Sequence, residues 1–202
     1  MFVKRFLKYL PSMVDRPIGE VVWCYAEWQP AYESIENTHV RFHQGLLGLE
    51  EFPPQQTARL LIIDDLMSEA DQRVTDLFTK GSHHRNLSIL YLSQNVFHQS
   101  KGARDVSLNS HFIVVFKSPR DSSQISYLSR QVFPKYPKLV KEAYYDACQV
   151  PHDYLCLNFK QSTSDEHRVT TCIFPDDKQH LLTSLNRLNH PSKTYKTPLP
   201  NQ

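Results

Sequence analysis

The chain has 202 residues, 40% of them hydrophobic and 22% charged, and its formal net charge at pH 7 is +2. This length is sufficient for one sizeable hydrophobic core, and so small a net charge gives no general argument for nucleic-acid binding. The sequence contains no apolar run close to the roughly 18 residues of a transmembrane helix and no secretory signal pattern, so we expect a soluble intracellular protein without membrane contact.

Four scattered cysteines predict reduced thiols rather than a zinc site or a disulfide framework. They lie far apart without short paired spacing, and two of them fall within apparent strands: Cys24, Cys148, Cys156 and Cys172. Structural zinc ligands come in closely spaced pairs, so these cysteines indicate core thiols in a reducing compartment.

The first quarter of the chain is predicted to contain one helix, one strand and an insertion. Apolar residues recur at helical spacing over residues 1–10, and we expect this helix to stop at Pro11. Residues 21–25 are typical of a strand. Residues 27–54, which end in a Pro-Pro pair, indicate an irregular insertion that contains a helix.

Residues 60–65 are Leu-Leu-Ile-Ile-Asp-Asp, an apolar run that ends in two adjacent carboxylates. Apolar side chains on both faces indicate a strand buried on both sides, as in the middle of a parallel α/β sheet. A helix is expected over 68–80, with Ser68 and Asp71 as its capping pair and Gly81 as the residue that ends it.

The rest of the chain continues the alternation of strands and helices. A second buried strand is expected over 87–92, and it closes on Ser93, Gln94 and Asn95. The later predicted elements, in chain order, are a polar loop over 101–109, a third apolar strand over 111–116, helices over 123–132 and 136–148, strands over 154–159 and 168–174, and a helix over 177–188.

This order predicts an α/β fold with a mostly parallel sheet and helices on both of its faces. We expect one domain over residues 1–190. The Pro-containing tail over 191–202 is expected to be disordered. Several of the strands end in polar residues, which parallel pairing would bring together at one edge of the sheet.

The acid pair Asp64-Asp65 is the strongest chemical signal in the sequence. Acids at the carboxyl end of a buried strand lie where open α/β sheets bind ligands. The arrangement resembles a Walker B element, in which the first acid holds Mg²⁺ and the second activates a water. The alternative for an isolated Asp-Asp pair is a turn or a helix cap, because short acids cap helices well.

Several further motifs occur in a fixed order around this pair. They are Ile-Ile-Asp-Asp-Leu-Met at 62–67, Leu-Phe-Thr-Lys-Gly-Ser-His-His-Arg-Asn-Leu-Ser at 77–88, Gln-Asn-Val-Phe at 94–97, Leu-Asn-Ser at 108–110, and Phe-Lys-Ser-Pro-Arg-Asp at 116–121. With them, the chain up to about Pro175 resembles P-loop ATPases of the FtsK/HerA superfamily. More narrowly, it resembles the DNA packaging ATPases of Polinton/Maverick elements and related viruses.

The resemblance implies a P-loop NTPase fold of the ASCE, RecA-like class, a three-layer sandwich. It also implies an ATP-driven translocase of double-stranded DNA that works with ATP and Mg²⁺ as a homo-oligomeric ring, in a nucleus, a virus factory or a virion. Asp64 would be the Mg²⁺ ligand, Asp65 would polarise the attacking water, and Gln94 would sense the γ-phosphate. Arg120 or Arg104 would be the arginine finger for a neighbouring subunit's nucleotide.

Two of these roles have a plain structural alternative. For Gln94 it is a satisfied amide in a turn. For Arg120 it is a pair with Asp121 or a cap on the following helix.

One part of a P-loop site is absent from these 202 residues. No Gly-x-x-x-x-Gly-Lys-[Ser/Thr] occurs, and the five glycines are isolated from one another. In the family this loop precedes a helix that resembles residues 2–10, so we expect a chain truncated after its Walker A motif, without the first strand. The strands at 87–92 and 112–116 should then either pair directly or leave an unfilled slot, and ATP binding should be weak.

Two histidine pairs invite a metal site, but neither has a nearby third ligand. The turn at 83–86, His-His-Arg-Asn, suggests a subunit interface or a contact to DNA phosphates, with a solvated loop as the alternative. His39 and His43, at helical i, i+4 spacing, are expected to lie on the surface.

Two other functions compete with the packaging ATPase. One is a degenerate, non-enzymatic module that binds protein or nucleic acid. Aromatic and cationic residues over 136–145 could supply a DNA contact for it. The alternative for these residues is an amphipathic helix with a solvated lysine face. The other is a different P-loop class such as a helicase. It predicts the same two acids but not the motifs at 83–88 and 116–121.

Overall fold

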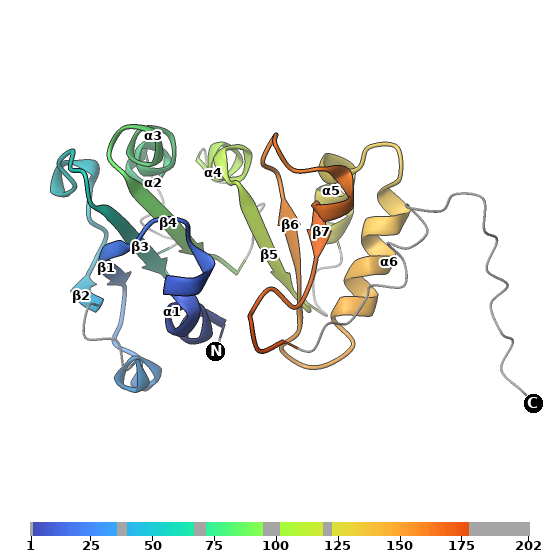
Figure 1. The fold of residues 1–202 in the computed structure, drawn as a ribbon, viewed down its shortest axis with the longest axis horizontal. Helices are drawn as coiled ribbons and strands as arrows, with labels where there is room; N and C mark the ends of the chain where they lie inside the picture. The colour runs from blue at the N-terminus through green and yellow to red at the C-terminus, as the bar shows by residue number, and fades with distance from the viewer. Residues whose placement is uncertain (1, 36–39, 67–71, 95–101, 119–122, 178–202) are drawn as a thin grey trace, which may run out of the picture. The chain divides into compact units, whose positions relative to one another are not determined.

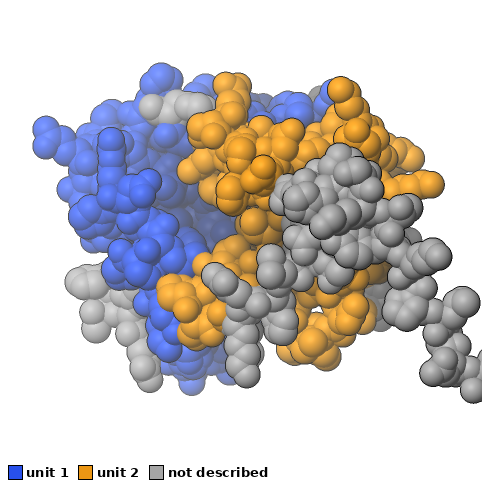
Figure 2. All heavy atoms as spheres, turned by 45° about the vertical axis from the view of Figure 1, so that its right-hand side comes forward, with its two compact units in different colours: residues 1–110 blue, residues 111–202 orange. Residues whose placement is uncertain are grey.

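A computed structural model describes residues 2–35, 40–66, 72–94, 102–118 and 123–177. The chain divides into two compact units, residues 1–110 and residues 111–202, which Figure 2 shows in blue and orange. The single domain expected over 1–190 stays a prediction. The predicted capping pair at Ser68 and Asp71, the helix over 177–188 beyond its first residue, and the tail over 191–202 lie outside the described residues.

Unit 1 is built on a sheet of four parallel strands (Figure 1). Its strands are β1 (Ile18–Tyr25), β2 (Val40–Gln44), β3 (Ala58–Asp64) and β4 (Leu87–Leu92), in the spatial order β2-β1-β3-β4. The predicted strands at 21–25, 60–64 and 87–92 are therefore confirmed, as is the parallel α/β sheet. This layout is compatible with a Rossmann-like fold. The burial expected for 87–92 is wrong, because β4 is the last described strand of this sheet and only Leu87 in it is buried.

One face of this sheet is covered by helix α1 (Phe2–Met13). Val3, Leu7 and Leu10 are buried there against alternate residues of β1 and β3. The expectation that this helix stops at Pro11 is wrong, because Pro11 lies inside its last turn. A proline there removes only one helical hydrogen bond, and the packing of the buried leucines holds the turn in place.

The opposite face is covered by a helical segment with three parts, α2 (Gln72–Asp76), the π-helical η4 (Leu77–Gly81) and α3 (Ser82–His84). Gly81 does not end this segment as predicted, since its φ is −67° and the helix continues. A side chain at position 81 would place its Cβ 3.2 Å from Leu87 and 3.3 Å from Leu49. Glycine is therefore needed for close packing, and Asn86 (φ 48°) takes the left-handed position beyond the helix.

Three parts of unit 1 differ from the sequence-based prediction or extend it. The insertion over 27–54 contains two short 3₁₀ turns, η1 (Pro30–Ser34) and η2 (Leu49–Glu51), but also strand β2, which was not predicted. The segment expected as a polar loop forms helix α4 (Ala103–Asn109). Strand β2 and helix α4 both carry polar residues among their apolar ones. A prediction based on continuous apolar runs therefore misses them.

Unit 2 combines a small antiparallel sheet with two helices. Its strands are β5 (Phe112–Phe116), β6 (Tyr154–Asn158) and the two-residue β7 (Val169–Thr170), in the order β5-β6-β7. Helices α5 (Ser123–Val132) and α6 (Pro137–Ala147) confirm the predicted helices, and the turn η5 (Asp165–His167) precedes β7.

The mostly parallel sheet expected for the whole chain does not extend to unit 2. A single helix between two strands carries the chain back to the start of the first strand, and the pairing is then parallel. Here two packed helices separate β5 from β6, so the chain returns to the end at which β5 stopped. Strands β4 and β5 belong to different units, so the expected direct pairing of 87–92 with 112–116, or an unfilled slot between them, stays a prediction.

Candidate functional site

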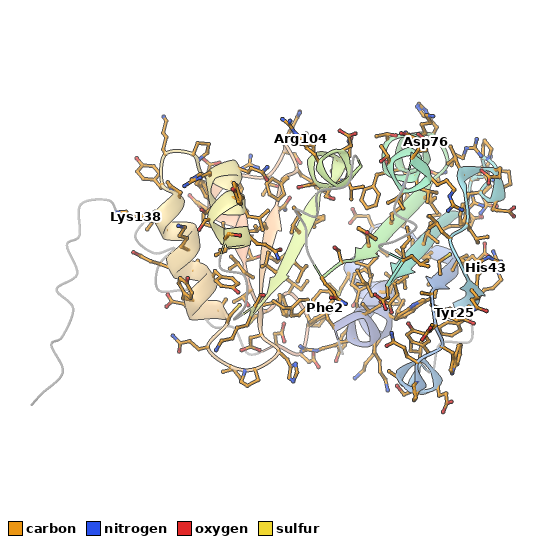
Figure 3. The ribbon with its side chains drawn as sticks, turned by 180° about the vertical axis from the view of Figure 1, so that it is seen from behind. Phe2, Tyr25, His43, Asp76, Arg104 and Lys138 are labelled. Atoms are coloured by element: carbon orange, nitrogen blue, oxygen red, sulfur yellow. The ribbon has the colours of Figure 1, made fainter. Side chains whose placement is uncertain are left out.

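The acid pair lies at the carboxyl edge of the parallel sheet of unit 1. Asp64 is the last residue of β3, and its neighbours in register are Tyr25 on β1 and Leu92 on β4. Because all four strands run the same way, the ends of β1, β3 and β4 meet at this edge. Figure 3 labels Tyr25 at the end of β1 and His43 on the neighbouring strand β2.

An open pocket of about 260 Å³ lies at this edge. It is lined by residues from the ends of two adjacent strands and from the segment after β1: Gln29, Asp64, Asp65, Leu92, Ser93 and Gln94. Three of the residues singled out from the sequence, Asp64, Asp65 and Gln94, therefore come together. Asp64 is half-buried, whereas Asp65 and Gln94 are exposed.

Asp64 has a hydrogen-bond partner that no sequence pattern predicted. The Tyr32 hydroxyl, from η1, donates a hydrogen bond of 2.8 Å to Asp64 Oδ2. Burial, followed by the hydrogen bond to Asp64, raises the pKa of Tyr32 far above its usual value, so the hydroxyl keeps its proton and remains a donor. Tyr32 and Gln29 lie within an insertion predicted only as irregular, and no local pattern connects them with an acid more than 30 residues away.

Asp65 has a left-handed backbone, with φ 54°. Few residues adopt this conformation without strain, and Asp is among the more tolerant ones. The chain thus turns sharply directly after β3 and presents the second carboxylate at the solvent-facing side of the pocket, while Leu66 next to it is fully buried.

Neither predicted arginine joins this pocket in the described residues. Arg120 lies outside the described residues. Arg104 is exposed on α4, at the end of unit 1 opposite to Tyr25 (Figure 3). An arginine finger that acts on a neighbouring subunit's nucleotide would lie away from the nucleotide site of its own subunit. The arginine-finger role of Arg104 therefore stays a prediction.

The turn at 83–86 uses two of its side chains inside unit 1. Arg85 Nη1 donates to the carbonyl oxygens of Leu49 and Phe52, at 2.9 Å each. Asn86 Nδ2 donates to the carbonyl oxygen of Gln55 at 2.9 Å. These bonds tie the loop after η2 to the end of α3, which gives Arg85 and Asn86 a structural role.

In the parts of the chain that the structure describes, the remaining sequence signals do not assemble into a second site. His43 is half-buried on strand β2, and His39 lies outside the described residues, so the expected surface position of the pair stays a prediction. On α6, Tyr144 is buried and its hydroxyl donates to the carbonyl oxygen of Phe116, so it does not form part of an exposed DNA-binding face. Tyr136 and Tyr145 are exposed, as is Lys138 (Figure 3).

The donors at the pocket suit one kind of metal complex and not another. Among the residues that the structure describes, no group of three or more His, Cys, Asp or Glu side chains is placed to hold a metal ion. Mg²⁺, however, is commonly bound by one or two carboxylates together with substrate phosphates and water. Asp64 and Asp65 therefore fit a magnesium–nucleotide complex, and do not fit a metal held by protein ligands alone.

The fold and the site together define an α/β protein with a parallel sheet and a carboxylate pocket at the carboxyl edge of its strands. Comparison of the chain with protein-family models, curated proteins and solved structures found no match. No helix in the described parts of the chain is both long enough and apolar enough to cross a membrane.

Proposed function

We propose that this chain contains the metal-holding and water-activating half of a packaging-type ATPase site, from a motor that moves double-stranded DNA as a homo-oligomeric ring. The observation that carries the proposal is the shared pocket of Asp64, Asp65 and Gln94, at the ends of adjacent parallel strands. The ordered motifs described above support the narrower assignment to Polinton/Maverick-type and viral ATPases.

In this proposal each polar residue of the pocket has one task. Asp64, half-buried at the end of β3, would hold Mg²⁺, which supplies positive charge beside the phosphates when a nucleotide is bound. Asp65, exposed after the turn, would orient a water and accept its proton. The Gln94 amide, which lines the pocket two residues after β4, would hydrogen-bond a phosphate oxygen or that water.

The same proposal predicts weak nucleotide binding by these 202 residues. A P-loop cradles phosphates with consecutive backbone N–H groups and a lysine, and the sequence contains no Gly-x-x-x-x-Gly-Lys-[Ser/Thr]. The acids contact metal and water, not the phosphates directly. Steady hydrolysis of Mg-ATP by this chain, measured as released phosphate and lost in D65N, would contradict the predicted weakness.

The metal half of the site can be tested without turnover. The two tryptophans, Trp23 and Trp28, both lie beside Tyr32, so terbium(III) bound at Asp64 should show luminescence sensitised by indole. Terbium is a hard, oxygen-seeking cation that stands in for Mg²⁺. We expect saturable luminescence that Mg²⁺ competes away and that D64N weakens by at least about 100-fold, with a smaller loss for D65N.

The control is D105N, which removes an exposed carboxylate on α4, outside the pocket. Its titration midpoint should equal that of the unsubstituted chain. Equal terbium affinity in the unsubstituted chain and in D64N would overturn the proposed site.

The absent phosphate loop favours a second candidate, a non-enzymatic binding module that descends from such an ATPase. Filter binding of duplex DNA over a salt series separates the two. Real phosphate contacts weaken steeply with salt, with a slope close to the number of phosphates neutralised. DNA binding without any metal binding at Asp64 would support the module and contradict the ATPase site.

A further inference from the structure

Tyr32 is a buried polar residue for which the proposed function has no role. Only 4% of its surface is exposed. Its hydroxyl nevertheless reaches the edge of the pocket and donates to Asp64 Oδ2 at 2.8 Å. A buried hydroxyl needs a partner, but any backbone carbonyl would satisfy it. The choice of a half-buried carboxylate at the pocket therefore needs an explanation.

The ring of Tyr32 is fixed by other aromatic rings. Four neighbours from β1, β2 and the segment after β1 lie with their ring centroids between 5.1 and 5.8 Å from it: Trp23, Tyr25, Trp28 and Phe42. We call these five residues the aromatic cluster. Contacts of this kind add favourable energy beyond the burial of apolar area and leave the ring little rotational freedom. The direction of the hydroxyl is thus set by packing around the ring.

The hydrogen bond divides the two oxygens of Asp64 between two tasks. Oδ2 accepts from Tyr32, and within the described residues this is the hydrogen bond that the carboxylate makes. Oδ1 makes no hydrogen bond in the part of the chain that the structure describes, and Asp64 lines the pocket. A carboxylate held through one oxygen loses rotational freedom before a cation arrives, so binding through the other oxygen needs less ordering.

We propose that Tyr32 is a positioning residue, which holds Asp64 so that Oδ1 faces a divalent cation in the pocket. The inference rests on the proposed function, because it needs Asp64 to be a metal ligand. It adds that ring packing in the aromatic cluster sets the direction of the Tyr32 hydroxyl, so that only this hydroxyl of the cluster acts on Asp64. Partners that hold a metal-binding side chain typically change metal affinity by about 10- to 100-fold when they are removed.

The test compares two variants that each lose one phenolic hydroxyl from the aromatic cluster. Y32F removes the donor to Asp64. Y25F is the matched control, since Tyr25 packs against Tyr32 and is the register neighbour of Asp64, while the hydroxyl bound to Asp64 belongs to Tyr32. The midpoint of the terbium titration, repeated with Mn²⁺ by calorimetry, should rise about 10- to 100-fold in Y32F and change less than about twofold in Y25F.

A double variant separates positioning from a general effect on packing. If Tyr32 acts through Asp64, then Y32F added to D64N should cause no further loss of metal affinity. A packing effect would lower the affinity in both backgrounds by the same factor. Urea unfolding of each variant, followed by tryptophan fluorescence, confirms that unit 1 is folded at the conditions of the titration.

The outcomes distinguish this inference from the proposed function. Metal binding that D64N abolishes and Y32F leaves unchanged would overturn the inference alone. An equal further loss on adding Y32F to D64N would overturn it as well. Terbium binding that D64N leaves unchanged, or no binding by the unsubstituted chain, would overturn the proposed function and the inference together.

Discussion

Replacement of Arg85 by Met decides whether the turn at 83–86 serves the fold or a partner. Arg85 is half-buried, and its Nη1 donates to the carbonyl oxygens of Leu49 and Phe52 at 2.9 Å each. Methionine keeps most of the apolar stem but removes both bonds, which leaves two carbonyl oxygens near the buried ring of Phe52 without this donor. The expected result is a less stable unit 1 with unchanged DNA binding.

The size of this effect follows from two opposing contributions. Hydrogen bonds from a charged donor contribute about 1.5 to 3 kcal/mol each, and sharing one nitrogen in a half-exposed position puts each of the two bonds near the lower value, about 3 kcal/mol together. Against this, burial and then the nearby Arg85 lower the pKa of Arg59, so removing Arg85 relieves some repulsion. We expect a net loss of about 2 kcal/mol in the free energy of unfolding.

Tryptophan fluorescence measures this loss in unit 1 alone, because both tryptophans of the chain lie there. With a urea dependence of roughly 2 kcal/mol per molar, the midpoint of unfolding should fall by about 1 M in R85M. The control R41M removes an exposed ion pair with Glu20 and should shift the midpoint by less than about 0.3 M. A shift as small in R85M, accompanied by weaker binding of duplex DNA, would refute the structural role and support the interface.

Two further predictions concern packing and pH. In G81V the Cβ would lie 3.2 Å from Leu87 and 3.3 Å from Leu49. The added methyl groups should therefore lower the free energy of unfolding of unit 1 by about 1 to 3 kcal/mol, measured by tryptophan fluorescence. An unchanged midpoint of unfolding would contradict the close approach. In unit 2, burial raises the pKa of Cys156 from 9.0 to about 11. The unfolded chain therefore releases this proton first, and the stability conferred by the neutral thiol is complete below pH 9 and is lost between pH 9 and 11. C156A should lessen that loss by roughly 2 kcal/mol in urea unfolding followed by circular dichroism, whereas identical pH profiles would exclude a buried thiol.

The strands of unit 1 could be predicted because their sequences carry the signal locally. Residues 60–63 are a continuous apolar run, as the burial of β3 between β1 and β4 requires, and the run over 87–92 is interrupted only by Ser88. Strand β2 was missed because Arg41, His43 and Gln44 interrupt its apolar residues, as an edge strand allows. Helix α4 was missed for the same reason, since much of its surface is exposed.

Pairing direction and long-range contacts were beyond the sequence patterns. The apolar residues of β5 look the same whether the next strand is parallel or antiparallel, and the two helices that follow decide the direction. Gly81 is a common signal for a helix end, but its role depends on Leu49 and Leu87, which lie elsewhere in the sequence.

In the candidate site, too, some features follow from local sequence patterns and others depend on long-range contacts. The meeting of Asp64 and Gln94 follows from parallel pairing of two consecutive strands, β3 and β4, so it could be expected. The contact of Tyr32 with Asp64 depends on how the insertion folds, and an irregular segment carries no periodic pattern. The sequence patterns therefore predicted the polar residues at the strand ends. They could not predict the Tyr32 hydrogen bond that holds Asp64.

The left-handed backbone of Asp65 places folding and chemistry in competition at one position. At φ 54°, glycine would relieve strain, and asparagine would tolerate the turn about as well as aspartate, without a negative charge beside Asp64. Selection for thermal stability alone would therefore drive position 65 away from aspartate. A chain that keeps the carboxylate there gives up some stability, and engineering that seeks a more robust variant would remove the second acid first.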